Sequence, residues 1–194
     1  PQATQQMLED VFFNAEAWIG EEVATEFARA EGAAFVSGDG TKKPKGFLAY
    51  TTAATADSAR AFGTLEHVAT GVAADWAASN PQDILLTLVY KLKAGFRSNA
   101  RFVMNKGILA DVRKWKDTTG NYIWRPGLEA GQPDTLLGYG ITEAEDMPAK
   151  AANALPIAFG DFSRGYLIVD RIGTSILRDP YTAKPYVGFY TRKR

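Results

Sequence analysis

Three carboxylates lie close together in the sequence and are the first candidates for chemistry. Glu143, Glu145 and Asp146 stand just before Met147 and Pro148. Paired carboxylates can transfer protons or hold a hard cation such as magnesium or calcium. Side chains in such a polar run usually point to solvent, so a solvated turn is the simpler interpretation. A carboxylate-dependent hydrolase that uses these three residues remains the alternative function.

Other catalytic classes lack the residues that they require. His67 is the only histidine and no Gly-x-Ser-x-Gly motif surrounds a serine, so a catalytic triad has one candidate base and no nucleophile elbow. The absence of cysteine excludes disulfides, zinc–thiolate sites and cysteine nucleophiles. The segment Gly38 to Lys43 lacks the spacing of a phosphate-binding loop and follows a predicted helix, so we interpret it as a helix stop. We predict no enzyme activity, no cofactor and no metal site.

The overall composition narrows the function further. The chain has 194 residues, with 22 Lys and Arg against 22 Asp and Glu, so no net field attracts it to nucleic acid or anionic lipid. No apolar stretch approaches the roughly 20 residues of a membrane span, and residues 1–6 lack the features of a signal peptide. The lack of Cys fits synthesis in a reducing compartment. The sequence has no initiator Met and stops at Arg194 directly after a strand-like run, so we expect it to be part of a longer protein.

One long helix is predicted from Thr4 to about Ala34. Its apolar residues recur at steps of three and four, the helical period, at Leu8, Phe12, Ala15, Ile19, Val23, Phe27 and Ala30. Thr4 can cap its start, and Ser37 to Gly40 supplies a turn that ends it. At about 1.5 Å per residue the helix would span roughly 45 Å, more than a compact domain of this size needs. It is therefore predicted to act as a spine.

The middle and the end of the chain predict a mixture of helices and strands. Asn80-Pro81-Gln82-Asp83 is typical of a helix start with Asn80 as the cap, followed by an apolar face of Ile84, Leu85, Leu88, Val89, Leu92 and Phe96. Asn105 is predicted to cap a second helix that buries Ile108, Leu109, Val112 and Trp115. Strands are predicted at residues 101–104, 138–142, 157–160, 166–169, 175–178 and 186–192, and a surface loop at 127–133.

Charge is divided between the two ends of the chain. Residues 1–31 hold seven acidic residues and one basic residue, while residues 164–194 hold seven basic residues and two acidic ones. The acidic helix could simply be a solvated face. Alternatively, the helix and the basic C-terminal segment meet, either within one subunit or between neighbouring copies, where complementary charge would fix their register. The second interpretation predicts salt-sensitive self-assembly.

Six short motifs follow one another along the chain in an order that is typical of one family. They are the acidic helix with Ala33 to Gly40 and Pro44 to Leu48, then Phe102 to Asn105 with Ile108 to Trp115, Lys116 to Ile123, Leu136 to Gly138, Asp146 to Pro148, and Phe159 to Phe162. In this order they resemble motifs of tailed-phage major capsid proteins with the Hong Kong 97 fold. The resemblance covers essentially the whole sequence, beginning at the spine helix.

This resemblance implies a fold and a role. The fold would be α+β, with residues 1–49 and 172–194 in a peripheral domain that contains the spine helix and a β ribbon, and residues 50–171 in an axial domain around the capsomer centre. The chain would be a structural subunit of an icosahedral phage capsid that assembles into hexamers and pentamers and encloses the double-stranded DNA genome. An encapsulin-like shell protein is the nearest alternative. The loop at 127–133 would face the capsomer centre.

The partners implied by the resemblance are copies of the same chain, packaged DNA bound without sequence specificity, and scaffold, protease and portal proteins. Assembly would take place in the bacterial cytoplasm, and the mature location would be the virion capsid. Some relatives form a Lys–Asn crosslink, but no Asn or Glu lies between Asp179 and Arg194, so we assign no crosslinking residue. Position and charge suggest as subunit contacts Glu21, Glu22 and Glu26 on the helix, and Arg192, Lys193 and Arg194 at the basic end.

Overall fold

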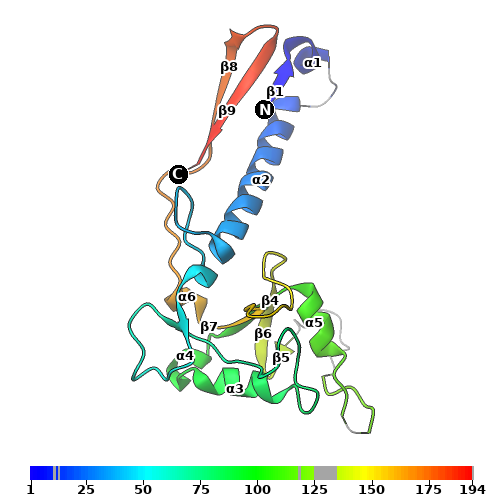
Figure 1. The fold of residues 1–194 in the computed structure, drawn as a ribbon. Helices are drawn as coiled ribbons and strands as arrows, with labels where there is room; N and C mark the ends of the chain where they lie inside the picture. Colours follow the sequence, from blue (N-terminus) through cyan, green and yellow to red (C-terminus); the bar gives the residue numbers. More distant parts are fainter. Residues whose placement is uncertain (11, 13, 118, 125–134, 194) are drawn as a thin grey trace. The chain divides into compact units, whose positions relative to one another are not determined.

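The computed structural model describes residues 1–10, 12, 14–117, 119–124 and 135–193 (Figure 1). The predicted loop at 127–133 and the predicted contact residue Arg194 lie outside this range. The chain divides into two compact units, which we call unit 1 (residues 1–34 and 168–194) and unit 2 (residues 35–167). Both boundaries lie before the predicted domain borders at 49/50 and 171/172. The peripheral and axial roles stay predictions.

Unit 1 is a small sheet packed on a long helix. Its elements are β1 (Gln2–Thr4), α1 (Gln5–Asp10), most of α2 (Ala15–Ser37), β8 (Ser175–Ala183) and β9 (Tyr186–Arg192). The strands form an antiparallel sheet in the order β1-β9-β8. Ile19 of α2 packs against Ala3, Val187 and Phe189 of the sheet. The first and last segments of the sequence therefore share one core.

Strand β8 is irregular in its second half. Its pairing with β9 is continuous from Ser175 to Asp179 and then shifts before Ala183. The Asp179 carboxylate accepts hydrogen bonds from the backbone amides of Tyr181 and Thr182, at 2.9 and 3.2 Å. The Asp179 side chain thus stabilises a local turn, which interrupts the regular hydrogen bonding between β8 and β9, as a β-bulge does.

The prediction of one helix from Thr4 to Ala34 was right about the cap at Thr4 and wrong about continuity. The Thr4 hydroxyl accepts a hydrogen bond from the Met7 amide at 3.2 Å, at the start of α1. Helix α1 ends at Asp10, and α2 begins separately at Ala15. The Asn14 side chain accepts a hydrogen bond from the amide of Ala17 at 3.1 Å, which is the geometry of a helix cap. Because the apolar period continues across Asn14, periodicity alone did not reveal this start. The remaining 23-residue helix spans about 35 Å at 1.5 Å per residue.

Unit 2 is built on a four-stranded mixed sheet in the order β5-β6-β4-β7. Its strands are β5 (Thr135–Leu136), β6 (Tyr139–Glu143), β4 (Arg101–Met104) and β7 (Ile157–Gly160). Strand β4 pairs parallel to β6 and antiparallel to β7. A separate parallel pair joins β2 (Thr52–Ala53) to β3 (Leu65–Glu66). The helices are the 3-10 turn η1 (Phe47–Ala49), α3 (Asp83–Lys91), α4 (Ala94–Arg97), α5 (Lys106–Arg113) and α6 (Phe162–Gly165).

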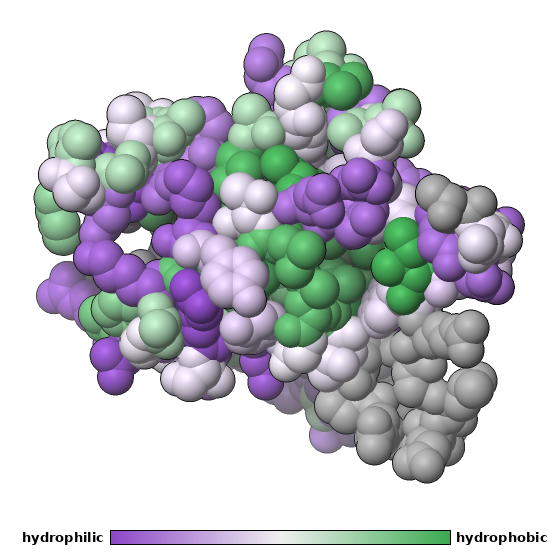
Figure 2. All heavy atoms as spheres, turned by 90° about the horizontal axis from the view of Figure 1, so that it is seen from below, coloured by the Kyte–Doolittle hydropathy of each residue, from purple (hydrophilic) through white to green (hydrophobic). Residues whose placement is uncertain are grey.

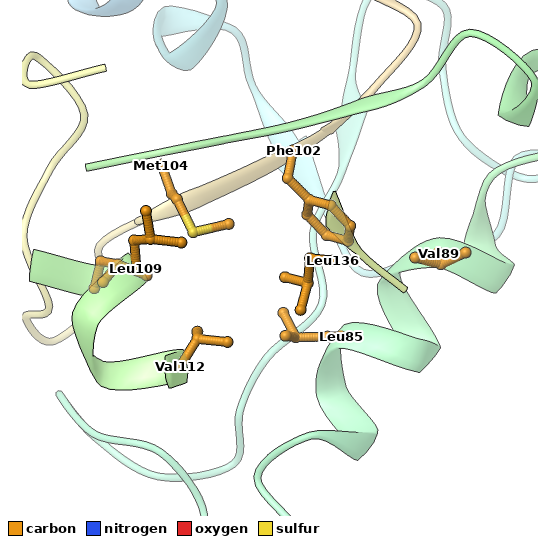
Figure 3. Packing of buried hydrophobic residues seen from close by; sticks show 8 residues of the cluster. Leu85, Val89, Phe102, Met104, Leu109, Val112 and Leu136 are labelled. Carbon is orange, nitrogen blue, oxygen red and sulfur yellow. The ribbon is translucent and has the colours of Figure 1, made fainter. Parts of the chain in front are cut away.

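The core of unit 2 lies between the sheet and helices α3 and α5 (Figure 3). Phe102 and Met104 project from β4 and are fully buried. They meet Leu85 and Val89 from α3, and Ile108, Leu109 and Val112 from α5. Helical periodicity predicted these five buried residues, which the structure confirms. Phe96, predicted on the same face as Leu85 and Val89, is instead 39% exposed in α4.

Most predicted strands are present, with one exception. The strands at 101–104, 157–160 and 186–192 are confirmed with their bounds. Residues 166–169 were predicted to form a strand but have no partner strand, and the border between the units falls among them. Local propensity alone cannot supply a pairing partner for such a segment.

The predicted cap of α3 is also different in the structure. Asn80 was predicted to cap this helix but has a φ of 49°, and Gln82 occupies the position before the helix.

Asn105 links the end of β4 to the start of α5 and to a distant loop. Its side-chain oxygen accepts from the Ile108 amide at 2.9 Å, and its Nδ2 donates to the Met147 carbonyl at 3.0 Å. The predicted cap is thus confirmed. We expect Asn105→Ala to lower the free energy of unfolding by about 1 to 2 kcal/mol in urea denaturation, because both hydrogen bonds are lost.

The matched variant is Asn105→Asp, which keeps the acceptor at the start of the helix and removes only the donor to Met147. It should therefore destabilise less than alanine. Equal losses for the two variants would contradict a capping role.

Candidate assembly surfaces

The acidic helix and the basic end of the chain meet within unit 1. Arg178 of β8 lies 3.0 Å from Glu16 of α2, and the Lys193 ammonium donates to the Glu31 carboxylate at 2.5 Å. This hydrogen bond from Lys193 to Glu31, with the nearby Asp170 carboxylate, raises the pKa of Lys193 above its usual value. The sequence allowed the helix and the basic segment to meet either within one subunit or between copies. The structure shows the contact within one subunit.

The predicted contact residues fall into two groups in the structure. Glu21 and Glu22 are exposed on α2 and have no ion pair within the described part of the chain, and Glu26 faces Arg29 of the same helix at 3.7 Å. Arg192 is exposed, and its Nε donates to the Ser175 hydroxyl at 3.1 Å. Lys193 is already engaged by Glu31 and is largely covered. The exposed glutamates and Arg192 can therefore contact another molecule, whereas Lys193 already pairs with Glu31 of the same chain.

The sheet of unit 1 has one covered face and one open face. Val187 and Phe189 of β9 are buried toward α2, so the alternate residues Tyr186, Gly188 and Tyr190 point away from it. Leu177 of β8 lies directly opposite Tyr190 in the register and shares this open face. The sequence analysis did not identify these residues, although the alternation of Tyr186, Gly188 and Tyr190 is a visible period of two.

Unit 2 carries an apolar hollow of about 900 Å³ beside strand β7. Its lining includes Trp76, Ile84, Leu88 and Phe159, with Lys91 at its rim. Figure 2 shows apolar residues gathered in the middle of the face seen from below. His67 also lines the hollow, and its Nδ1 is buried without a hydrogen-bond partner among the described residues. The single histidine therefore lies in the wall of the hollow, and none of the described serine or threonine side chains is hydrogen-bonded to its ring.

A cluster of charged residues closes one side of this hollow. The Glu66 carboxylate lies 2.8 Å from Arg60 and 2.9 Å from Lys91, and both Glu66 and Arg60 have side chains only 14% exposed. The hydrogen bond from Lys91, together with Arg60, holds the pKa of Glu66 below its usual 4.5. These ion pairs tie β3 and the preceding loop to α3.

The lowered pKa predicts how the stability of unit 2 depends on pH. The folded state favours the charged form of Glu66, so its contribution is present above pH 4.5 and is lost as pH falls through the lower, folded-state pKa. We expect Glu66→Gln to destabilise the protein at pH 7 and to have a smaller effect near pH 3, measured by urea unfolding. The control Glu22→Gln, at an exposed carboxylate without an ion pair among the described residues, should leave stability at pH 7 unchanged. An effect of Glu66→Gln that does not shrink at low pH would contradict this assignment.

The three carboxylates that suggested a hydrolase lie apart from these features. Glu145 pairs with Lys106 at 3.0 Å on the surface, and Glu143 and Asp146 are exposed. Nowhere in the described ranges do three or more His, Cys, Asp or Glu side chains converge as a metal site would require. None of the helices in that same part of the chain combines the length and hydropathy that a membrane crossing requires.

Comparisons with known proteins point in one direction. The model of the phage capsid family matches residues 1–194. The chain is similar to a solved structure described as the capsid of an empty GTA particle, computed with C5 symmetry, with 51% sequence identity and a TM-score of 0.91 over 100% of this chain. A second, the capsid of a native GTA particle, has the same identity and TM-score. No curated protein matches the chain.

The match covers 65% and 64% of these two capsid chains, so the chain spans less than two thirds of their length. The predicted resemblance and the predicted α+β capsid fold are confirmed, since the similarity extends over the whole chain at high identity. By sequence and by fold, this chain belongs to the phage capsid family.

Proposed function

We propose that the chain is a structural subunit of a phage-type capsid and that it has no enzymatic activity. The observation that carries this proposal is the 51% identity, over the full chain, to the capsid of a GTA particle. The acidic cluster gives the hydrolase no comparable support, because Glu145 is held by Lys106 and the other two carboxylates are exposed.

In this proposal, the subunit assembles with copies of itself into hexamers and pentamers that close an icosahedral shell around double-stranded DNA in the bacterial cytoplasm. The balance of 22 basic and 22 acidic residues suits a shell that encloses DNA without binding it tightly. Scaffold, protease and portal proteins are the further partners that such an assembly would use. Residues 1–49 and 172–194 would form the peripheral domain and residues 50–171 the axial domain.

The contacts between copies would involve charged residues at the two ends of the chain. We assign Glu21, Glu22, Glu26, Arg192 and Arg194 to this role. Lys193 would act indirectly, since its ion pair with Glu31 holds the end of β9 near α2.

Electron microscopy tests the proposed function directly. The full-length protein is expressed alone and with the neighbouring genes of its phage or prophage, and the products are examined by negative staining. Closed icosahedral shells are the expected result. A small, monodisperse protein under both conditions would refute the proposal and return attention to Glu143, Glu145 and Asp146.

Ionic strength is expected to control the yield of assembly. Raising the salt concentration from 0.1 to 1 M shortens the Debye length from about 10 to about 3 Å, which weakens attraction between exposed charges far more than between covered ones. Sedimentation of assembly reactions should show fewer shells at high salt. A yield that does not change would argue against charge-directed contacts.

A further inference from the structure

We infer that the open face of the sheet in unit 1 binds the exposed, acidic side of helix α2 of a second copy. This inference rests on the proposed function and deepens it, because it names the two surfaces that meet. The open face is defined by Leu177, Tyr186, Gly188 and Tyr190, with Arg192 at its end.

The open face lacks a covering layer within the described part of the chain. A β-sheet with an apolar face is stable when that face packs against another element. Helix α2 packs on one side only, where Ile19 meets Val187 and Phe189. On the other side Leu177, Tyr190 and Tyr186 remain 63%, 64% and 46% exposed.

The composition of the open face is typical of a protein contact. Tyrosine and arginine are enriched where proteins meet, because they bury a large area and keep a polar end. Leu177 and Tyr190 are opposite each other on neighbouring strands, so their side chains form one continuous patch. Gly188, between Tyr186 and Tyr190, leaves the middle of the patch shallow. An elongated element such as a helix can lie along such a surface.

Unpaired charge identifies the element that covers this face. Arg192 ends β9, and Lys184 lies in the turn before it, so a cation stands at each end of the patch. Neither has a carboxylate partner among the described residues. Glu21 and Glu22 on α2 also have no cationic partner among the described residues. Arg178 pairs with Glu16, and Lys193 pairs with Glu31. Asp179, opposite Gly188 on the same face, accepts hydrogen bonds from the Tyr181 and Thr182 amides. With Lys184 and Arg192 the open face keeps a net positive charge, opposite in sign to Glu21 and Glu22.

The position of the two surfaces decides how two copies meet. Helix α2 packs on the covered face of the sheet, so its exposed side and the open face of the sheet lie on opposite sides of unit 1 and cannot both meet the same second copy. A helix-to-sheet contact is therefore heterologous, and it repeats from copy to copy and closes into rings when the rotation permits. The inferred interface is therefore directional.

Crosslinking between engineered cysteines tests this geometry, because residues 1–194 contain no cysteine of their own. The full-length variants Glu22→Cys and Leu177→Cys are assembled in a one-to-one mixture and treated with a bismaleimide. A covalent dimer is expected from the mixture and not from either variant alone. The control mixture of Glu143→Cys with Leu177→Cys, which moves the first cysteine to an exposed site in unit 2, should yield none.

Charge reversal gives a second test with an internal rescue. We expect the double variants Glu21→Lys/Glu22→Lys and Lys184→Glu/Arg192→Glu each to lose at least tenfold in assembly yield, measured by sedimentation velocity. In a mixture, each reversed surface meets an opposite charge on the other variant, so rings with an even number of subunits, such as hexamers, should form again. The control Glu143→Lys/Asp146→Lys makes the same charge change in unit 2 and should assemble normally.

The outcomes separate this inference from the proposed function. Shells that form without the Glu22–Leu177 crosslink, or from both reversed variants on their own, would overturn the inferred interface and leave the capsid role standing. Failure of the unsubstituted protein to assemble would overturn both.

Discussion

Replacing Phe102 with alanine is expected to lower the free energy of unfolding by about 3 to 5 kcal/mol, the usual range for a buried aromatic side chain. Phe102 is 0% exposed at the centre of the unit 2 sheet. Its ring lies 4.5 Å from that of Phe159 and 6.4 Å from that of Tyr139, measured between ring centroids. Alanine would remove these contacts and leave a cavity between strands whose backbones are fixed by pairing on both sides.

Urea denaturation followed by circular dichroism measures this loss. The control is Phe62→Ala, which makes the same chemical change at a fully exposed ring and should shift stability by less than about 0.5 kcal/mol. Because a loss of this size is a large part of the stability of an ordinary domain, Phe102→Ala should also reduce the yield of folded protein. Similar small effects for both variants would mean that Phe102 is not at the centre of the core.

Substituting Gly46 with alanine is the second change with a large expected effect. A Cβ atom at this position would lie 2.4 Å from the carbonyl carbon and oxygen of Val36 and 2.5 Å from the amide nitrogen of Ser37. The backbone angles of Gly46, φ −67° and ψ 153°, are acceptable for alanine, so the effect arises from this contact alone. The contacted atoms belong to the backbone at the end of α2 and cannot rotate away.

Relief of this clash would have to break the hydrogen bond from the Gly46 amide to the Gly38 carbonyl, at 2.8 Å. We expect Gly46→Ala to destabilise the protein by about 1 to 3 kcal/mol or more in thermal unfolding. Gly95→Ala is the matched control, because Gly95 lies in helix α4 with no atom within 4 Å of the added carbon. That change should be neutral or slightly stabilising. A neutral Gly46→Ala would show that the loop after α2 can move freely.

Local patterns in the sequence predicted the elements of unit 2 well. The apolar period after Asp83, the cap at Asn105 and the strand at 157–160 depend on neighbouring residues, and all three are present. The helix start at Asn14 was not predicted, because the apolar residues keep their helical spacing on both sides of Asn14 and so hide its role as a cap. The strand at 2–4 was also missed, since it exists only through pairing with β9 at the other end of the chain.

The candidate surfaces were only partly predicted, because strand pairing again could not be known from the sequence. Charge is visible in the sequence, so the acidic helix and the basic end could be singled out before their contact through Glu16 and Arg178 was known. The apolar face of Leu177 and Tyr190 was not predicted. Assigning both residues to one face requires the register between β8 and β9, which a single sequence does not provide.

The bulge in β8 limits strand pairing along the open edge of the unit 1 sheet. A free strand edge is a template for uncontrolled growth into fibres, because its outward amides and carbonyls can accept another strand. Between Asp179 and Ala183 the edge is closed to such growth, since Pro180 has no amide hydrogen and the Asp179 side chain occupies two amides. In β8 the regular register is confined to Ser175–Asp179, so the bulge shortens the edge that another strand could pair with. In the proposed capsid role, closed shells and open fibrils would compete for the same subunits, and this irregular turn would favour the shell.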